Sequence, residues 1–138
     1  MNSGYSKTPL ENKLDLKDGF KCILNEAPKH YIKWFKSLDL NLNLINDTNN
    51  KSIDFIHALC NTEESLKNVA KNLIPALKYN GMLWLSWPKG SSNIKTDLKR
   101  EPIRAFFIAN DLVDVKVAAN DEDWSGLKFA YRLKNRKQ

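Results

Sequence analysis

GMLWLSWPKGSSNIKTDLKREPIRAFFIANDLVDVKVAANDEDWSGLKFAY, residues Gly81 to Tyr131, is the stretch that decides the fold. It opens with an apolar run typical of a buried strand, continues through a loop into a helix with two adjacent phenylalanines, and closes with two more strand patterns. Its unusual residues fall in two places. One is Trp87-Pro88-Lys89, where the first strand ends, and the other is 121–126, between the last two strands. We expect both places to lie at the same edge of one sheet.

Helix and strand patterns alternate along the rest of the chain. Helices are predicted at about 9–16 with Thr8 as the cap, from Pro28, from Thr62, and within 96–110. The third of these is predicted to kink or break early at Pro75 and otherwise to stop at Asn80-Gly81. Strands are predicted at 20–25, 42–45, 52–60, 82–87, 112–119 and 127–133, the last two joined by a loop of about six or seven residues.

This alternation indicates the fold class. Strands that alternate with helices predict an α/β fold with a mostly parallel, doubly wound sheet and right-handed crossovers. No helix pattern separates the final two strands, so the last strand must run antiparallel to its predecessor. We expect a single domain over 1–138, with a loose N-terminal segment at 1–7 and a basic tail at 134–138.

Composition narrows the class of protein. The chain has 138 residues, 42% of them hydrophobic, which is enough for one buried core. It contains no apolar run of membrane-spanning length and no signal-peptide pattern, so we expect a soluble, cytoplasmic protein with no membrane partner. Cys22 and Cys60 fall in apolar segments without C-x-x-C spacing, which predicts buried thiols rather than a redox pair or a metal site.

The net charge of +6 raises the question of nucleic acid as a partner. Most Lys and Arg residues alternate with acids, as on solvated faces, and only the end of the chain is one-sided. The bases there are Lys128, Arg132, Lys134, Arg136 and Lys137. No exposed aromatics are interleaved with them, as they are in many single-strand binders. Nucleic-acid binding through this tail is therefore only our third hypothesis.

Short segments spread over nearly the whole chain carry a resemblance. They are Gly4–Leu10, Lys13-Leu14, Trp87–Lys89, Thr96–Leu98, Leu112–Asp114, Lys116-Val117, Asp121 and Trp124–Leu127. Through them the chain resembles a family of short bacterial proteins catalogued as a domain of unknown function, which implies a fold and no established activity. The element order is similar to the Rossmann-like fold of class I methyltransferases, shortened by one strand–helix unit. That resemblance implies the sheet order 2-1-3-4-6-5, with only strand 6 antiparallel.

Candidate binding residues lie where strands end, because ligands of open α/β sheets bind outside the carboxyl ends of the parallel strands. The predicted strand ends place at this edge Asn25, Asp47, Trp87, Lys89 and Asp121. In the implied order, strand 6 lies beside strand 4, so Trp124 should approach Trp87 and Lys89.

The segment after Trp87 is a candidate anion site. Lys89 follows the strand end, and Gly90-Ser91-Ser92 supplies flexible backbone and hydroxyl donors that could cradle an oxyanion or a phosphate. Asp97 and Lys99 follow in the same segment. The alternative is a mobile surface loop with a solvated lysine.

The acidic run and the two histidines can each be interpreted as functional or as structural residues. Asp121, Glu122 and Asp123 could serve acid–base chemistry or a cation, but such a run is more often a hairpin connection with an Asx turn. A cation would need further oxygen ligands that the sequence does not identify, so no metal is predicted. His57, inside a central strand, is predicted to be a core imidazole with satisfied hydrogen bonds, whereas His30 is a catalytic candidate by position alone.

A methyltransferase would need a cofactor turn after the first strand. Such turns use glycines so that backbone N–H groups can approach the ligand, and 25–31 contains none. In favour of S-adenosylmethionine, Asp47 follows the second strand, where this kind of fold places an acid on the ribose hydroxyls.

Three hypotheses follow. The first is a non-enzymatic binding module that uses no cofactor and takes a small anionic ligand or a protein partner, with Trp87, Lys89 and Trp124 forming the floor and charge of the site. The second is a divergent S-adenosylmethionine-dependent methyltransferase with Asp47 at the ribose and Lys89 or Asp97 at the substrate. The third is nucleic-acid binding.

Overall fold

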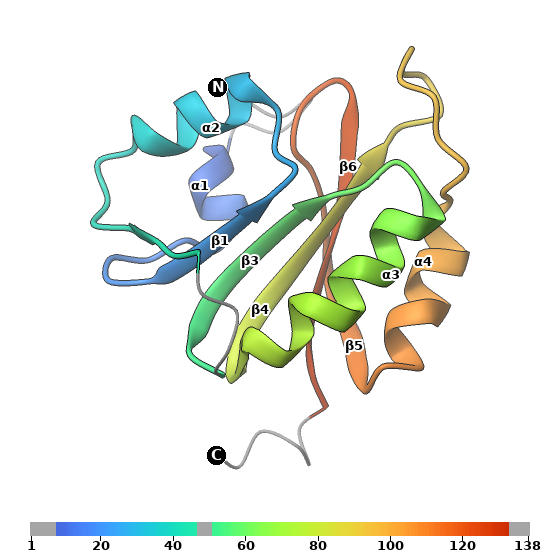
Figure 1. The fold of residues 1–138 in the computed structure, drawn as a ribbon. Coiled ribbons are helices and arrows are strands. Elements are labelled where there is room, and N and C mark those ends of the chain that lie inside the picture. Colours follow the sequence, from blue (N-terminus) through green and yellow to red (C-terminus); the bar gives the residue numbers. More distant parts are fainter. Residues whose placement is uncertain (1–7, 47–50, 133–138) are drawn as a thin grey trace.

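The computed structural model describes residues 8–46 and 51–132. Within them, six strands form one sheet in the order β2-β1-β3-β4-β6-β5 (Figure 1). The elements are α1 (Leu10–Lys13), β1 (Lys21–Asn25), α2 (Lys29–Lys36), β2 (Asn43–Leu44), β3 (Ile53–Leu59), α3 (Glu63–Asn72), a 3₁₀ turn (Ile74–Ala76), β4 (Leu77–Pro88), α4 (Arg100–Ile108), β5 (Leu112–Ala119) and β6 (Trp124–Tyr131). Strands β2, β1, β3 and β4 pair in parallel, and β6 is antiparallel to both β4 and β5. The predicted fold class and strand order are confirmed.

Helices cover both faces of the sheet, with α1 and α2 on one side and α3 and α4 on the other (Figure 1). Each face has its own apolar cluster. Phe55 of β3 packs in the cluster under α1 and α2, whereas its neighbour Ile56 packs in the cluster under α3 and α4. Both are fully buried, as expected for a central strand covered on its two faces.

Two predicted helix starts agree with the structure, whereas α1 is capped by Pro9 rather than Thr8 and ends early. The Thr62 hydroxyl accepts a hydrogen bond from the Ser65 N–H at 3.1 Å, which is the expected N-cap of α3. Pro28 occupies the N-cap position of α2. Helix α1 was predicted to reach about residue 16 but ends at Lys13, because Asp15 turns the chain with a φ of 61°, outside helical backbone geometry.

The predicted continuation of α3 to Asn80-Gly81 is wrong. The helix ends at Asn72, Pro75 lies in the 3₁₀ turn, and the chain is already a strand from Leu77 onward. Proline cannot donate to the helical ladder, so of the two outcomes expected at Pro75 the early break is the one that occurs. Gly81 lies inside β4, where a Cβ atom would approach the Ile53 carbonyl oxygen to 2.8 Å. Its role is therefore to let β4 approach β3 closely.

Replacing Gly81 by alanine should destabilise the fold by about 2 kcal/mol, since the new methyl group would meet backbone atoms that cannot move aside cheaply. The measurement is the midpoint of urea unfolding. Gly90→Ala is the matched control, because no atom lies within 4 Å of a Cβ there. Equal midpoints for the two variants would contradict this role of Gly81.

The connection between the last two strands is shorter than predicted. It comprises residues 120–123, because β6 begins at Trp124, which pairs with Pro88 of β4. Backbone bonds to a neighbouring strand thus extend β6 into a segment whose local sequence has the composition of a loop.

An ion cluster ties α1 to the sheet. Asp15 accepts from Lys128 of β6 at 3.0 Å and from Lys116 of β5 at 3.3 Å. Partial burial opposes ionisation of Asp15, but these two lysines outweigh it and hold the pKa of the carboxyl below its usual value. Lys128, one of the bases assigned to the one-sided chain end, is therefore engaged within the fold. Residues 133–138 of the basic tail and the predicted loose segment 1–7 lie outside the described residues.

Cys22 and Cys60 are buried free thiols on opposite faces of the sheet, as predicted. Burial raises the pKa of Cys22 to about 12 and that of Cys60 to about 11, so neither forms a thiolate at neutral pH. No helix in 8–46 or 51–132 is both long and apolar enough to cross a membrane.

Candidate functional site

The two unusual segments of the sequence meet at the carboxyl edge of the sheet. Pro88 of β4 lies opposite Trp124 of β6. One residue further on, the backbone N–H of Lys89 donates to the carbonyl oxygen of Asp123 at 2.7 Å. The predicted approach of Trp124 to the end of β4 is confirmed, while the binding roles of these residues remain predictions.

The two tryptophans do not form a common floor, which corrects part of the first hypothesis. Trp87 packs in the cluster under α3 and α4. Trp124 pairs with Pro88 rather than with Trp87, and side chains alternate between faces along a strand. Trp124 therefore faces the opposite side of the sheet. Lys89 lies beside Trp87 in a cavity that Trp124 does not line.

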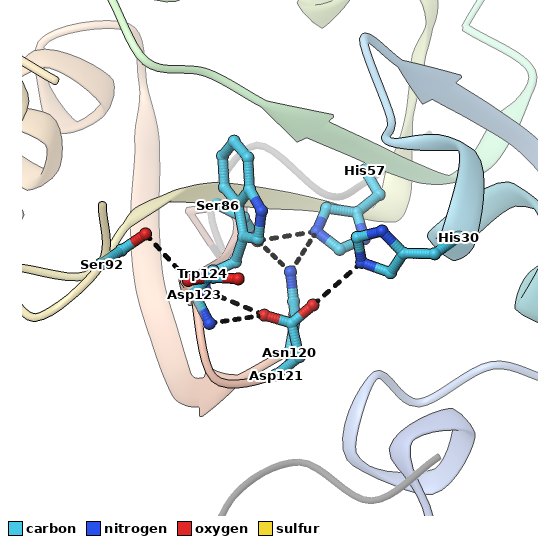
Figure 2. A network of polar contacts seen from close by, with 8 residues as sticks. All are labelled: His30, His57, Ser86, Ser92, Asn120, Asp121, Asp123 and Trp124. Carbon is cyan, nitrogen blue, oxygen red and sulfur yellow. Dashed lines mark hydrogen bonds and ion pairs between the residues drawn. The ribbon is translucent and has the colours of Figure 1, made fainter. Parts of the chain in front are cut away.

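Asp121 holds the β5–β6 connection together (Figure 2). Its Oδ1 accepts from the backbone N–H groups of Asp123 and Trp124, at 2.8 and 3.0 Å. Its Oδ2 lies 3.1 Å from Nε2 of His30, at the start of α2. The carboxylate of Asp123 in turn accepts from the hydroxyl of Ser92 at 2.9 Å. The acidic run is thus a hairpin connection with an Asx turn; the carboxylate of Asp121 contacts the start of α2, and that of Asp123 contacts the loop after β4.

Directly inside this rim lies a buried polar network that the sequence analysis did not predict as a unit; Figure 2 shows three of its members, His57, Ser86 and Asn120. Nδ1 of His57 is 2.7 Å from the Tyr31 hydroxyl, and its Nε2 is 2.7 Å from the Ser86 hydroxyl. The Asn120 amide donates to the same Ser86 oxygen at 2.7 Å. The side chains come from α2, β3, β4 and the β5–β6 connection, so the network joins four parts of the fold.

Glycine creates the space for this network. Gly126 lies opposite Ser86 in the β4–β6 ladder, and a Cβ atom there would lie 3.1 Å from the Ser86 oxygen. A residue with a side chain would crowd the hydroxyl out of its position. Strand alternation places His57 and Ser86 on the same face, toward α2.

The network has more hydrogen-bonding groups than internal partners. Burial lowers the pKa of His57 from 6.5 to about 3, so its ring is neutral and carries one N–H. The ring can therefore accept from only one of the two hydroxyls, of Tyr31 or of Ser86, and it donates its N–H to the other. Asn120 Oδ1 has no hydrogen-bond partner in the described parts of the chain.

A serine hydroxyl hydrogen-bonded to a histidine is the geometry of an activated nucleophile. Ser86 and His57 are both 0% exposed, so a substrate cannot reach the hydroxyl in this structure. The prediction that His57 is a satisfied core imidazole agrees with these contacts. The pair serves to fix the carboxyl edge.

The space beyond β1 is open on the side of β2. Tyr31 points into the core and His30 toward Asp121, so neither side chain fills it. A cavity of about 320 Å³ lies there, which we call the β1–β2 cavity. It is lined by Ile23, Leu24, Asn25, Ile32, Lys36, Leu44, Ile45, Asn46 and Leu73. Asp47, the predicted ribose ligand, follows Asn46 directly but lies outside the described residues.

The turn after β1 has a glycine-like backbone without a glycine. Glu26 adopts a φ of 54°, in the left-handed region that residues with a side chain rarely occupy. Its carboxylate accepts from the hydroxyl of Ser65 in α3 at 2.7 Å. This contact crosses from the end of β1 to the helix that follows β3, the point where strand order reverses and where such sheets bind ligands.

A second cavity, of about 480 Å³, lies between the end of β4 and the start of α4. We call it the β4–α4 cavity; it is lined by Trp87, Pro88, Lys89, Gly90, Ser92, Ile94, Thr96, Leu98, Lys99 and Arg100. Of the predicted residues, Trp87 and Lys89 line it. Ser91 is exposed and outside its lining, and Asp97 borders a different cavity, between α3 and α4.

Solved structures of similar fold include S-adenosylmethionine-dependent methyltransferases. A SAM-dependent methyltransferase from Aquifex aeolicus aligns with a TM-score of 0.56 at 12% identity, over 86% of this chain and 85% of that one. A TehB-like SAM-dependent methyltransferase from Corynebacterium glutamicum gives 0.55 at 10% identity, over 94% and 90%. The fibrillarin pre-rRNA processing protein of Methanococcus jannaschii gives 0.52 at 14% identity, over 94% and 71%.

No protein-family model and no curated protein matches the chain. At these identities the likeness is one of fold.

Proposed function

We propose that this chain binds S-adenosylmethionine in the β1–β2 cavity and transfers its methyl group to a small acceptor. The observation that carries the proposal is that cavity, whose lining includes the last residues of β1 and β2, two parallel strands of a sheet of methyltransferase-like order. Its volume of about 320 Å³ is within the usual range for small-molecule sites.

The lining of the β1–β2 cavity supports the proposal because it offers a partner for each part of the cofactor. The aliphatic side chains suit the flat adenine ring. The amides of Asn25 and Asn46 can hydrogen-bond the ribose hydroxyls or the adenine edge, and Lys36 can pair with the carboxylate of the methionine part. In this proposal Asp47 would add an acid for the ribose.

Glu26 contributes charge at the neighbouring position. The cofactor carries a positive sulfonium and an ammonium group, and both are favoured near a carboxylate. We assign Glu26 to this role, with the cofactor replacing the Ser65 hydroxyl as its partner. Methyl transfer breaks the sulfonium–methyl bond, forms a bond from the methyl to the acceptor nucleophile, and releases S-adenosylhomocysteine.

The test of the proposal is a thermal unfolding series with S-adenosylmethionine and S-adenosylhomocysteine. At about a hundred times its dissociation constant, a ligand should raise the melting temperature by on the order of 10 °C for a chain of this size. Reversing the charge at the cavity with Lys36→Glu should weaken binding about tenfold, which corresponds to the loss of one favourable charge contact.

Lys33→Glu is the matched control, since Lys33 is exposed on the same helix and does not line the cavity. The control should bind like the unmodified chain. An unchanged melting temperature at millimolar cofactor, or equal weakening in both variants, would refute binding in the β1–β2 cavity.

A further inference from the structure

We infer that the β4–α4 cavity is a binding site for an oxyanion group, a phosphate or a carboxylate, carried by a small molecule. The inference is independent of cofactor binding, because the β4–α4 and β1–β2 cavities share no lining residue. It rests on the charge, the walls and the loop contacts of the cavity.

The charge at this cavity is one-sided. Lys89, Lys99 and Arg100 line it, and no carboxylate residue does. None of these three side chains forms an ion pair with another residue in the ranges that the structure describes. Cations gathered around one space repel each other, and a bound anion converts that repulsion into attraction. The planar guanidinium of Arg100 can donate two parallel hydrogen bonds to two oxygens of the same anion.

The start of α4 adds to the positive potential. Lys99 is the N-cap residue of this helix and makes no side-chain capping hydrogen bond. The first backbone N–H groups of α4 carry partial positive charge that acts in the same direction as the three side chains. Pro102 supplies no N–H, and the carboxylate of Glu101 in the first turn opposes this potential but does not line the cavity.

The segment that encloses the cavity is held in place rather than loose. The Ser92 hydroxyl donates to Asp123 and accepts from the Ile94 N–H at 3.1 Å. The Thr96 hydroxyl donates to the Asn61 carbonyl oxygen at 2.9 Å. These bonds tie the segment to the β5–β6 connection on one side and to the end of β3 on the other. A defined wall is what distinguishes a binding loop from the solvated-loop alternative.

Apolar side chains complete the cavity and indicate a small molecule as the occupant. Trp87, Pro88, Ile94 and Leu98 line it next to the cations. An extended phosphate backbone would need a strip of bases along the surface, whereas here the bases surround one hollow. A compact ligand with an anionic group and an apolar part fits this lining. If the proposed methyl transfer holds, this describes the class of acceptor, because the cavity opens at the same carboxyl edge.

The test is a titration of the chain with phenyl phosphate, benzoate and inorganic phosphate, followed by amide chemical shifts and calorimetry, with no S-adenosylmethionine present. Amides of 89–100 should shift, and binding should weaken as salt is raised. Lys89→Gln and Arg100→Gln should each lower the affinity about tenfold, through the loss of a charge-assisted hydrogen bond. Comparing the three probes shows whether phosphate or carboxylate is preferred.

Lys95→Gln is the control, because Lys95 is an exposed lysine of the same segment that does not line the cavity. It should bind like the unmodified chain, and urea midpoints should be equal for all three variants. The inference is overturned if millimolar probes shift no amides, or if the control loses as much affinity as the others. It is also overturned if a single-stranded oligonucleotide binds more tightly than phenyl phosphate and depends on the same residues.

Discussion

Replacing His57 by leucine should lower the free energy of unfolding by about 4 kcal/mol. The side chain is fully buried, and its two ring nitrogens contact the hydroxyls of Tyr31 and Ser86. Leucine would fill a similar volume but leave the Tyr31 hydroxyl without its partner, and the Ser86 hydroxyl with the Asn120 amide alone. Each buried polar group stranded in this way costs about 1–3 kcal/mol. The loss would be a large part of a typical total stability of about 5–15 kcal/mol.

The chain supplies its own control, since it contains one other histidine. His30→Leu changes a side chain that is 54% exposed and whose contact with Asp121 is at the surface, so it should cost less than about 0.5 kcal/mol. Urea unfolding followed by fluorescence measures both variants. Adding Tyr31→Phe to His57→Leu should recover part of the loss, because it removes the hydroxyl that the leucine leaves without its partner. Similar midpoints for the two leucine variants would show that the network contributes little.

Acidification should destabilise this protein through the same histidine. Burial lowers the pKa of His57 from 6.5 to about 3 in the folded state, while the unfolded chain keeps the usual value. Well above pH 6.5 the ring is neutral in both the folded and the unfolded state, so its protonation does not affect the free energy of unfolding. Between pH 6.5 and about 3 only the unfolded state takes up the proton, so stability falls with pH. At pH 4.5, two units below 6.5, the loss is about 3 kcal/mol.

The measurement compares the unmodified chain with His57→Gln, whose side chain stays neutral at every pH and retains a donor and an acceptor. The difference between their unfolding free energies should shift by about 3 kcal/mol from pH 7.5 to 4.5. Carboxylates such as Asp15 titrate in both proteins and cancel in the difference. A constant difference over that range would mean that His57 is accessible to protons in the folded state.

Much of the fold could be predicted because it follows from local patterns. The apolar run of β3 indicates a strand covered on both faces, and Thr62 indicates a helix start by its hydroxyl alone. The missing helix between β5 and β6 requires the one antiparallel strand. Each of these signals lies within a few residues of the element that it predicts.

The wrong or missing predictions concern positions whose structural role is set by a residue far away in the sequence. Gly81 can end a helix or admit a neighbouring strand, and only the Ile53 carbonyl oxygen, reached by pairing, selects the second role. The polar network was not predicted for the same reason. His57 and Ser86 were visible as single polar residues in apolar strands, but Tyr31 and Asn120 join them only through the packing of α2 and the hairpin.

The separation of the two tryptophans was partly predictable. Trp87 follows Leu83 and Leu85 at alternate positions, and all three pack under α3 and α4. The face of Trp124 depends on the length of the preceding connection, which was predicted too long. A miscount of one residue in such a connection reverses the face of every side chain after it.

Residues 30–31 and 120–121 give the carboxyl edge a property of their own. In each pair one side chain faces the dry interior and the other faces solvent. The hairpin therefore contacts α2 directly at the surface, through Asp121 and His30, and indirectly in the interior, where Asn120 and Tyr31 both contact His57. Helix α2 borders one cavity, and Lys89, bonded to Asp123 of the same hairpin, borders the other. A ligand that shifts α2 on binding would therefore change the shape of both the β1–β2 cavity and the β4–α4 cavity. Thermodynamic linkage makes this effect reciprocal. If a ligand in one cavity changes the affinity of the other cavity for its ligand by some factor, the second ligand changes the affinity for the first by the same factor.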